Sequence, residues 1–372
     1  MRKLGVVIRR LVLVLVIILQ VAAVAEANLV TGGLQQDINN LVGKVGPGIV
    51  VGIDRGGQKW FSAAGRAEVE TGRLMTVQDQ LRLASVTKTF TAVLTMKLAE
   101  EGRLSLTDTV EDWLPGAFAN GDQITVRMLL NHSSGISNDA YMEPFLAEAW
   151  KNQGTKSWSS ADILPAIQKA NPAPRPGVAT SYSNAGYYLL GLIAEKASGE
   201  SVNEAMTKRF FQPNGMSRTA MLPDGTLTTP CSPGYAALTV DGTLQKQVNV
   251  GSMNLSWDYT AGSGVSTAVD MVVWVRALVS GKLVSNESFR QMVTPNGPSP
   301  IFGYGLMVDI RDGVPVGYVH TGQSAGVNSR WYYDIAADTV IFINTNYLNW
   351  DDPTAEVILI KELSAKILSH LR

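Results

Sequence analysis

The stretch that decides the fold is LRLASVTKTFTAVLTMKLAEEG, residues 81–102, because the residue pattern changes inside it. Its first residues are typical of a short strand. From Val86 onward apolar residues recur at helical spacing, and the middle of the segment carries no charge. Such a helix is expected to be buried on nearly all sides, and Gly102 is typical of a C-terminal cap. The sequence therefore predicts a buried helix with Ser85 and Lys88 at its start.

Ser85 and Lys88 form the pattern S-x-x-K, which allows two interpretations. Residues three apart in a helix share a face, so the hydroxyl and the amine can come within hydrogen-bond reach. A serine hydroxyl is a poor nucleophile until a base takes its proton, and burial lowers the pKa of a lysine enough for that task. The alternative is a serine that caps the helix and a lysine that faces solvent. The pattern by itself leaves both open.

Strand and helix patterns are distributed unevenly along the chain. Arg55-Gly56-Gly57 separates two strand patterns and indicates a hairpin. Residues 223–256, rich in Pro, Gly and Thr, are expected to form a long irregular segment. The expected strands cover residues 48–54, 58–64, 80–84, 305–310, 314–320, 327–335 and 339–345, and the clearest helices cover residues 124–131, 161–170, 185–198, 267–280 and 354–371.

This order predicts an α/β (α+β) fold in which one sheet is built from both ends of the chain and flanked by helices. Residues 28–104 and 258–372 would form the sheet domain, and residues 105–257 would form an all-helical insert. A cleft is expected where the two parts meet.

The N-terminus has the layout of a secretory signal peptide, residues 1–27. Four basic residues precede an apolar run from Leu11 to Leu19, and the small-residue pattern Ala25-Glu26-Ala27 follows. An uncleaved membrane anchor is the alternative, although the run is shorter than the roughly 20 residues usually needed. We therefore expect an exported protein, periplasmic or secreted, that meets the membrane only through an uncleaved leader.

Composition excludes several classes of protein. Cys231 is the only cysteine, so an internal disulfide and a cysteine-based metal cluster are both excluded. The formal net charge of -1 becomes about -4 without the leader, and the chain lacks the clustered cations of a nucleic-acid-binding protein. The three scattered histidines also argue against a catalytic zinc site.

Two further motifs favour the catalytic interpretation. Tyr182-Ser183-Asn184 lies in the middle of the chain, and His320-Thr321-Gly322 ends a predicted strand near the C-terminus. In this order, SVTK, YSN and HTG resemble the three active-site elements of the penicillin-recognising serine hydrolases. The likeness is to the branch of class C β-lactamases, serine D-alanyl-D-alanine carboxypeptidases and related esterases, and it implies the β-lactamase/transpeptidase-like fold. Other segments agree in order: RLSLTDTVEDWLPG (103–116), ITVRMLLNHSSGI (124–136), PGVATSYSNAGYYLLGLIAEKASG (176–199) and FGYGLMV (302–308).

The resemblance implies three catalytic residues. Ser85 would be the acylated nucleophile, Lys88 its proton acceptor, and Tyr182 the group that relays a proton to the leaving group. No metal and no organic cofactor is implied.

The resemblance also implies a set of substrate-binding residues. Asn184 would orient the lysine and the substrate amide, and His320 stands where many relatives have lysine. Thr321 would bind a substrate carboxylate or carbonyl. Gly322 would let a substrate lie close to the strand, and the backbone N–H groups of Gln323 and of the nucleophile would form an oxyanion hole.

Other motifs are interpreted as structural. Gly322-Gln323-Ser324-Ala325-Gly326 fits G-x-S-x-G, but that motif needs a helix to follow and here a strand pattern continues. Ser324 is therefore expected in a turn between strands. His132 is expected to be part of a helix C-terminal cap, and His370 lies on the last turn of the final helix. Tyr347-Leu348-Asn349 repeats Y-x-N outside the order of the three motifs.

Asp309 and Arg311 bear on the substrate. Enzymes that remove a terminal D-alanine need a cation for its carboxylate. If Asp309 faces the cleft it would repel that carboxylate, and Arg311 on the same strand face could offset the repulsion.

The expected function is a serine hydrolase acting through an acyl-enzyme, with a D-alanyl-D-alanine peptide as preferred substrate and penicillin as its mimic. An esterase for short acyl chains and a class C-like β-lactamase are the enzymatic alternatives, and a cell-wall peptide-binding protein is the non-enzymatic one. The partner is a small-molecule or peptide substrate, not a nucleic acid.

Overall fold

The computed structural model describes residues 33–371 except 119, 137–144, 146–147, 149–153, 170–174 and 241–242. The predicted signal peptide lies outside the described residues. The strands are β1 Gly48–Arg55, β2 Gln58–Gly65, β3 Leu81–Arg82, β4 Ala220–Met221, β5 Tyr235–Val240, β6 Thr243–Asn249, β7 Gly264–Ser266, β8 Met307–Arg311, β9 Val314–Ser324, β10 Val327–Asp334, β11 Thr339–Thr345 and β12 Tyr347–Asn349. The helices are α2 Thr87–Glu100, α3 Val110–Trp113, α4 Val126–Leu130, α6 Ser160–Lys169, α7 Asn184–Ser198, α8 Val202–Met206, α9 Ala268–Val279, α10 Asn286–Val293 and α11 Thr354–His370, with short 3-10 turns at η1 Ala84–Val86, η2 Gly121–Gln123 and η4 Tyr259–Ala261 and a π turn at η3 Thr207–Phe211.

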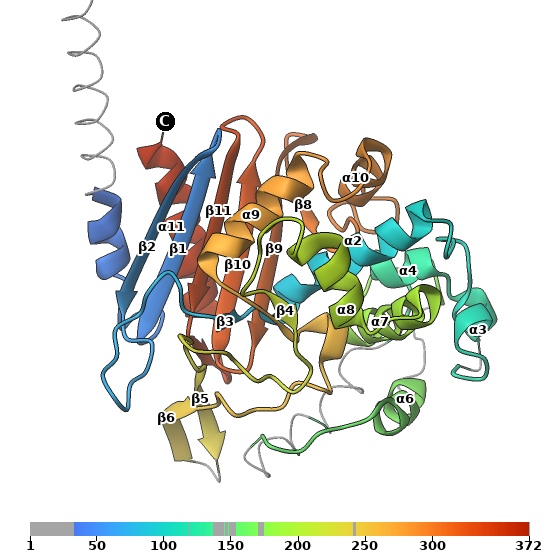
Figure 1. Cartoon of the computed structure of the whole chain (residues 1–372), viewed down its shortest axis with the longest axis horizontal. Coiled ribbons are helices and arrows are strands. Elements are labelled where there is room, and N and C mark those ends of the chain that lie inside the picture. Colours follow the sequence, from blue (N-terminus) through green and yellow to red (C-terminus); the bar gives the residue numbers. More distant parts are fainter. Residues whose placement is uncertain are drawn as a thin grey trace, which may run out of the picture.

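The main sheet joins the two ends of the chain. Its six strands follow the order β2-β1-β11-β10-β9-β8, and every neighbouring pair is antiparallel. The predicted hairpin is confirmed by the pairing of Arg55 with Gln58 across a two-residue turn. In Figure 1 the blue strands from the N-terminal part lie beside the red strands from the C-terminal part. The predicted α/β architecture with a sheet drawn from both ends is therefore confirmed.

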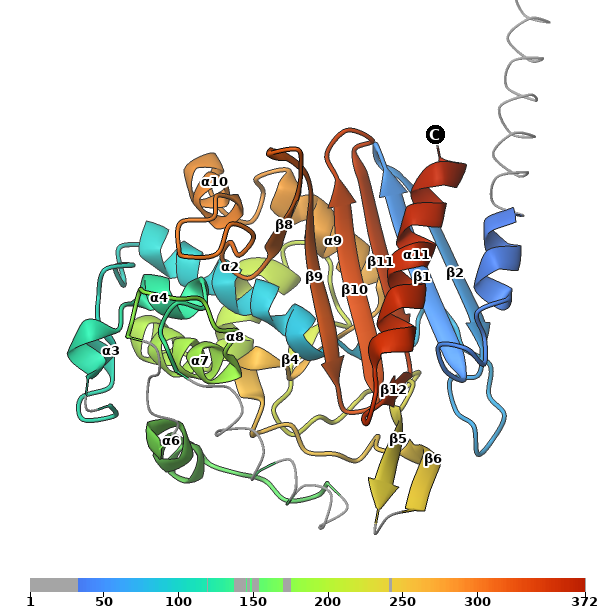
Figure 2. The ribbon, with the colours of Figure 1, turned by 180° about the vertical axis from the view of Figure 1, so that it is seen from behind.

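Helices cover both faces of this sheet. On one face α9 and α2 pack against the core that includes Trp331 and Phe342. On the other face α11 packs Ile360, Leu363 and Ile367 over β1, β10 and β11. Figure 2 shows α11 crossing the back of the sheet, away from α9. The two faces are thus separate apolar layers, which matters below because side chains alternate between them along each strand.

One expectation about the middle of the chain is wrong. The segment 223–256 was expected to be irregular and the insert all-helical, yet β5 and β6 form an antiparallel pair there. β5 also pairs in parallel with β12, more than a hundred residues away. The β12 partner comes from so far along the chain that it leaves no local signal, whereas Asp241-Gly242 between the two strand sequences is a local hairpin signal that the expectation overlooked. The predicted division between sheet domain and insert stays a prediction.

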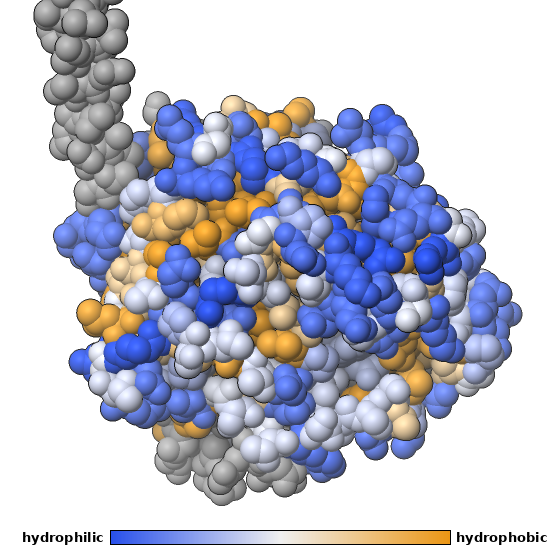
Figure 3. Space-filling model, in the orientation of Figure 1, coloured by the Kyte–Doolittle hydropathy of each residue, from blue (hydrophilic) through white to orange (hydrophobic). Residues whose placement is uncertain are grey.

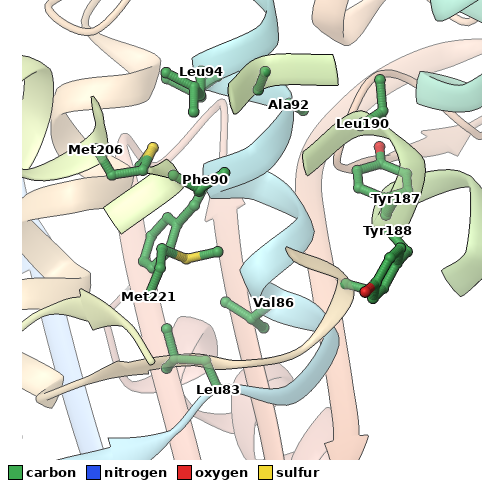
Figure 4. Packing of buried hydrophobic residues seen from close by; sticks show 14 of the residues in the cluster. Leu83, Val86, Phe90, Ala92, Leu94, Tyr187, Tyr188, Leu190, Met206 and Met221 are labelled. Carbon is green, nitrogen blue, oxygen red and sulfur yellow. The ribbon is translucent and has the colours of Figure 1, made fainter. Parts of the chain in front are cut away.

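Helix α2 is buried on nearly every side, as predicted. Residues 87–96 are all buried, and Figure 4 shows the helix between Met206 and Met221 on one side and Tyr187 and Leu190 on the other. The Phe90 ring centroid lies 4.5 Å from that of Trp274 and 5.3 Å from that of Phe211. Residues of the predicted sheet domain and residues of the predicted insert therefore both pack against α2.

The described surface is mostly polar. In the view of Figure 3 hydrophilic residues cover most of the molecule, and hydrophobic residues gather in smaller groups between them. Among the described residues, the structure has no helix that combines the length and the hydropathy of a membrane span.

Replacing Phe90 with Ala tests the structural role of α2. The substitution leaves a cavity between α2, α9 and the π turn, so we expect the free energy of unfolding to fall by about 3–5 kcal/mol. Urea denaturation followed by circular dichroism measures the loss. Leu74→Ala is the control, since this side chain is 68% exposed and its loss should change stability by less than about 0.5 kcal/mol. A loss below about 1 kcal/mol for Phe90→Ala would contradict this packing role.

Candidate active site

Ser85 lies in a tight turn between β3 and α2. The residue before it, Ala84, has a left-handed φ of 48°, a conformation that costs a non-glycine residue of order 1–3 kcal/mol and is frequent at functional sites. Contacts on both sides hold the turn in place. Leu83 N–H donates to the Gly264 carbonyl at 2.9 Å, and the Thr87 hydroxyl donates to the Ala84 carbonyl at 2.6 Å. The turn thus presents Ser85 at the start of the helix, as predicted.

Three oxygen atoms surround the amine of Lys88. Its Nζ donates to Asn184 Oδ1 at 2.5 Å and to the Ala261 carbonyl at 2.9 Å, and it lies 3.0 Å from Ser85 Oγ. A neutral amine has two N–H groups and one lone pair. The two carbonyl-type acceptors take both N–H groups, so the lone pair is left for the hydroxyl proton of Ser85.

Burial controls the charge of Lys88. The side chain is fully buried, and this burial lowers the pKa of its amine well below the usual value of 10.5 for lysine. The nearby Asp258 carboxylate favours the cation and offsets part of the shift. Burial in turn raises the pKa of Asp258, while the Lys88 cation lowers it. Sequence reasoning missed Asp258, because a single acidic residue in a loop carries no signal.

Tyr182 contacts both Ser85 and Lys88. Its hydroxyl is hydrogen-bonded to the Ser85 side chain, and burial raises its pKa above the usual value, so that it stays protonated at neutral pH. The Nζ of Lys88 lies 4.9 Å from the centroid of the Tyr182 ring. A protonated tyrosine that touches both the nucleophile and its base is placed to hand a proton to a leaving group.

His132 holds the YSN segment, a role that sequence reasoning missed. It directly follows the C-cap of α4 with a left-handed φ of 61°, as a C-terminal cap residue does. Its ring centroid lies 4.4 Å from that of Tyr182, and its Nδ1 accepts the N–H of Ser183 at 3.2 Å. Its carbonyl accepts the N–H of Ser181 at 2.9 Å. His132 therefore contacts the residues on both sides of Tyr182 as well as the ring.

His320 is a neutral side chain in this site. Its Nδ1 lies 2.6 Å from the Thr321 carbonyl, and because a carbonyl can only accept, Nδ1 carries the proton. Burial and the nearby Lys88 cation lower the pKa of His320 to about 3. Thr321 itself is half-buried on β9.

The HTG end of β9 is an open strand edge beside the nucleophile. The pairing of β8 with β9 ends at Met307 and Val319, and among the described residues 320–324 pair only with β10. A Cβ at Gly322 would lie 2.4 Å from the Leu83 carbonyl oxygen and 2.9 Å from the Ser85 nitrogen. Glycine is therefore required here so that β9 can approach the nucleophile turn. This contact within the protein explains the glycine more directly than the predicted room for a substrate.

The backbone N–H groups predicted to form an oxyanion hole, those of Ser85 and Gln323, thus lie on two touching segments. Gln323 itself is exposed on β9.

Ser324 and His370 are not part of a nucleophile elbow or a catalytic triad. Ser324 is the last residue of β9, and β10 follows after a two-residue turn, so no helix follows the G-x-S-x-G motif. His370 is paired with Asp37 at 2.9 Å on α11. Within the described part of the chain, no three His, Cys, Asp or Glu side chains are grouped as metal ligands.

Asp309 and Arg311 face away from the nucleophile. Asp309 accepts a hydrogen bond from the Tyr332 hydroxyl at 3.0 Å, and Arg311 lies 3.3 Å from the same carboxylate. Tyr332 belongs to the apolar layer under α11. Ser85 lies on the other face of the sheet, so the expected effect of Asp309 on a substrate carboxylate is absent.

With this geometry in place, comparison with known proteins identifies the family. The family model described as Beta-lactamase matches residues 34–364. The chain belongs to the β-lactamase family. The putative penicillin-binding protein PbpX of Bacillus subtilis (strain 168) is 27% identical over 329 residues, which cover 87% of this chain and 77% of that protein. Penicillin-binding protein 4 of Amycolatopsis lactamdurans is 28% identical over 300 residues, which cover 75% of each.

Solved structures of the β-lactamase fold agree. A D-stereospecific amidohydrolase from Streptomyces sp. superposes with a TM-score of 0.74 at 28% identity, covering 88% of this chain and 97% of that one. The D-amino acid amidase from Ochrobactrum anthropi SV3, complexed with L-phenylalanine amide, shares the fold with a TM-score of 0.80 at 23% identity over 92% of this chain and 98% of that one. The chain is thus a β-lactamase-family serine hydrolase, as the sequence motifs predicted.

Asn184→Asp tests whether Lys88 acts as a neutral base. A carboxylate at this position favours the ammonium form, so it raises the pKa of Lys88 and removes base at neutral pH. We expect the acidic limb of the pH–rate profile for acylation of Ser85 to move to higher pH, with the rate at pH 7 falling about tenfold per unit of pKa. Labelling by a fluorescent fluorophosphonate measures the rate. Asn184→Leu removes the acceptor without adding charge, and an equal shift in both variants would refute the assignment.

His132→Ala tests whether this residue positions Tyr182. We expect acylation to slow roughly 10- to 100-fold, because a small displacement of a catalytic group has an effect of that size. His132→Asn is the matched variant: asparagine tolerates a positive φ, and its Oδ1 can accept the Ser183 N–H. It should recover most of the rate. If both variants keep the wild-type rate while their urea midpoints fall, His132 has a purely structural role.

Proposed function

We propose that the protein is an exported serine amidohydrolase that forms an acyl-enzyme on Ser85, with a D-alanyl-D-alanine-type peptide as substrate and penicillin as a mimic of that substrate. The observation that carries the proposal is the position of Lys88 Nζ, 3.0 Å from Ser85 Oγ and bonded to Asn184 and to the Ala261 carbonyl. In the neutral amine these two acceptors engage both N–H groups, so that the lone pair is left for the Ser85 hydroxyl. Such an arrangement activates a serine and has no evident structural purpose, because a buried lysine is costly.

Acylation begins when Ser85 Oγ attacks the substrate carbonyl carbon and its proton moves to Nζ of Lys88. The new C–O bond pushes the electron pair onto the carbonyl oxygen, which the backbone N–H groups of Ser85 and Gln323 stabilise. The intermediate then collapses, the C–N bond breaks, and the leaving amine takes its proton through Tyr182. The proton gained by Lys88 restores that of the tyrosine.

Deacylation reverses these roles with water as nucleophile. Water gives a proton to the same Lys88 and Tyr182 pair, its oxygen bonds to the acyl carbon, and the ester bond to Ser85 breaks as the hydroxyl regains a proton. A difference of a few kcal/mol in activating this water separates rapid turnover from a long-lived adduct. The same chemistry therefore covers a peptidase that penicillin inhibits and an enzyme that destroys penicillin.

Two lines support this substrate class. Similar proteins are named penicillin-binding proteins, and a similar solved structure is named a D-stereospecific amidohydrolase. The layout of residues 1–27 supports export to the periplasm or beyond the cell, where wall peptides are found. A β-lactamase, an esterase for short acyl chains and a wall-peptide-binding protein without turnover are the other outcomes of the test.

Chemical labelling followed by product analysis tests the proposal. A fluorophosphonate and a labelled penicillin should each modify Ser85, as located by peptide mapping, and Ser85→Ala should abolish both adducts. D-alanine release from an N-acylated D-alanyl-D-alanine peptide is then compared with hydrolysis of p-nitrophenyl esters and cephalosporins. No adduct on Ser85 in folded protein would indicate a binding protein. Fast cephalosporin or ester hydrolysis without peptide cleavage would replace the proposed substrate.

A further inference from the structure

The His320 ring is a hydrogen-bond acceptor at Nε2 and not a cation. Because Nδ1 donates to the Thr321 carbonyl, the neutral ring keeps its lone pair on Nε2. The lowered pKa of His320 agrees with this, since the ring stays neutral through the physiological range. A substrate carboxylate has only acceptor oxygens at neutral pH. Nε2 therefore suits an N–H group and disfavours a carboxylate.

Lys88 does not supply the missing cation. Its amine is neutral when it acts as base, and both of its N–H groups are engaged by Asn184 and Ala261. When it does carry a proton, the buried Asp258 is its counter-charge. That carboxylate also acts on Tyr182, whose pKa it helps to raise. After proton transfer the Lys88 cation is thus balanced by the Asp258 carboxylate, and no net positive charge is left next to the nucleophile.

The arginines on the strands and turns around the site are used elsewhere. Arg311 binds Asp309, and Arg330 lies over the Tyr332 ring, with its guanidinium carbon 5.5 Å from the ring centroid. Both interactions are on the sheet face that α11 covers. Arg82 is fully buried and donates to four backbone carbonyl oxygens of residues 225–253.

Arg127 on α4 is engaged as well, since it donates to the Tyr304 hydroxyl at 3.0 Å. Arg82, Arg127, Arg311 and Arg330 therefore each have a partner within the protein.

We infer that the enzyme prefers substrates whose leaving group is uncharged, such as amides, carboxamide-terminated peptides and esters of D-amino acids, over peptides that end in a free carboxylate. The inference rests on the proposed function, because it concerns the same acyl-transfer site. It narrows that function, since among D-alanyl-D-alanine-type peptides those whose C-terminal carboxylate is blocked would be cleaved fastest. Specificity here results from His320, which offers an acceptor where a cation would be needed.

A pair of peptides with the same scissile bond tests the inference. N-acetyl-D-alanyl-D-alanine and its C-terminal carboxamide differ only in the charge of the leaving group. We expect kcat/KM for the carboxamide to exceed that for the free acid by at least about tenfold, because a carboxylate beside the acceptor Nε2 would be left without a donor. Equal values, or a preference for the free acid, would overturn the inference.

His320→Lys tests the residue itself. A lysine would supply the missing cation, so the ratio of kcat/KM values should move toward the free acid by about tenfold or more, with fluorophosphonate labelling as the check that Ser85 is still positioned. Arg311→Gln is the matched control, and it should leave the ratio unchanged because Arg311 lies on the far face of the sheet. A shift of the ratio in Arg311→Gln, or an unchanged ratio in a His320→Lys variant that is still labelled, would contradict the assignment.

Binding to Ser85→Ala separates this inference from the proposed function. The two peptides can be titrated by calorimetry into the folded variant without any turnover, and the carboxamide should bind more tightly. If fluorophosphonate fails to label the wild-type protein but the carboxamide still binds more tightly, the acyl-transfer proposal fails and the preference stands. If labelling succeeds and the free acid binds as well as the carboxamide, the preference fails and the acyl-transfer proposal stands.

Discussion

The site depends on one buried amine. Lys88 is kept from solvent by a helix that is surrounded on nearly all sides, and the loss of hydration is what makes its neutral form accessible. The same burial demands partners for its N–H groups, and the structure provides two carbonyl-type acceptors from separate parts of the chain. The neutral amine then has only its lone pair left to interact, and the Ser85 hydroxyl lies next to it.

The rest of the fold serves to keep that amine in place. The threonines of α2, which are unusual in a buried helix, donate hydrogen bonds to neighbouring carbonyls: Thr89 to Gly305 at 2.8 Å and Thr91 to Thr260 at 2.7 Å. Gly305 has a φ of 70°, and a Cβ there would lie 2.4 Å from the Cβ of Ala92. The strand-side and turn-side walls of the site are thus fixed directly to the helix that carries the base.

The charged groups of this site are few, and they are paired within the protein. Asp258 balances Lys88, and His320 remains neutral because its ring is buried and its Nδ1 proton is bound. The arginines of the neighbouring strands face the opposite side of the sheet. The result is a catalytic centre that can move protons internally and that presents a neutral ring at His320, which agrees with the inferred preference for neutral leaving groups.

The sequence by itself determined the elements whose signal is local. The period change after Ser85 gave the strand, turn and buried helix, the glycines after Arg55 gave the hairpin, and three motifs in order indicated which distant segments meet. Periodicity and turn chemistry depend on nearest neighbours, so they are visible in one dimension.

Only the tertiary structure decided the facts that depend on contacts between distant segments. These include the β5 and β12 pairing, the sheet face to which Asp309 points, the support of Tyr182 by His132, and the counter-charge from Asp258. The charge state of a side chain is likewise set by its burial and by groups far along the chain. A residue type in a sequence names what a side chain can do, and its surroundings select which of those roles it takes.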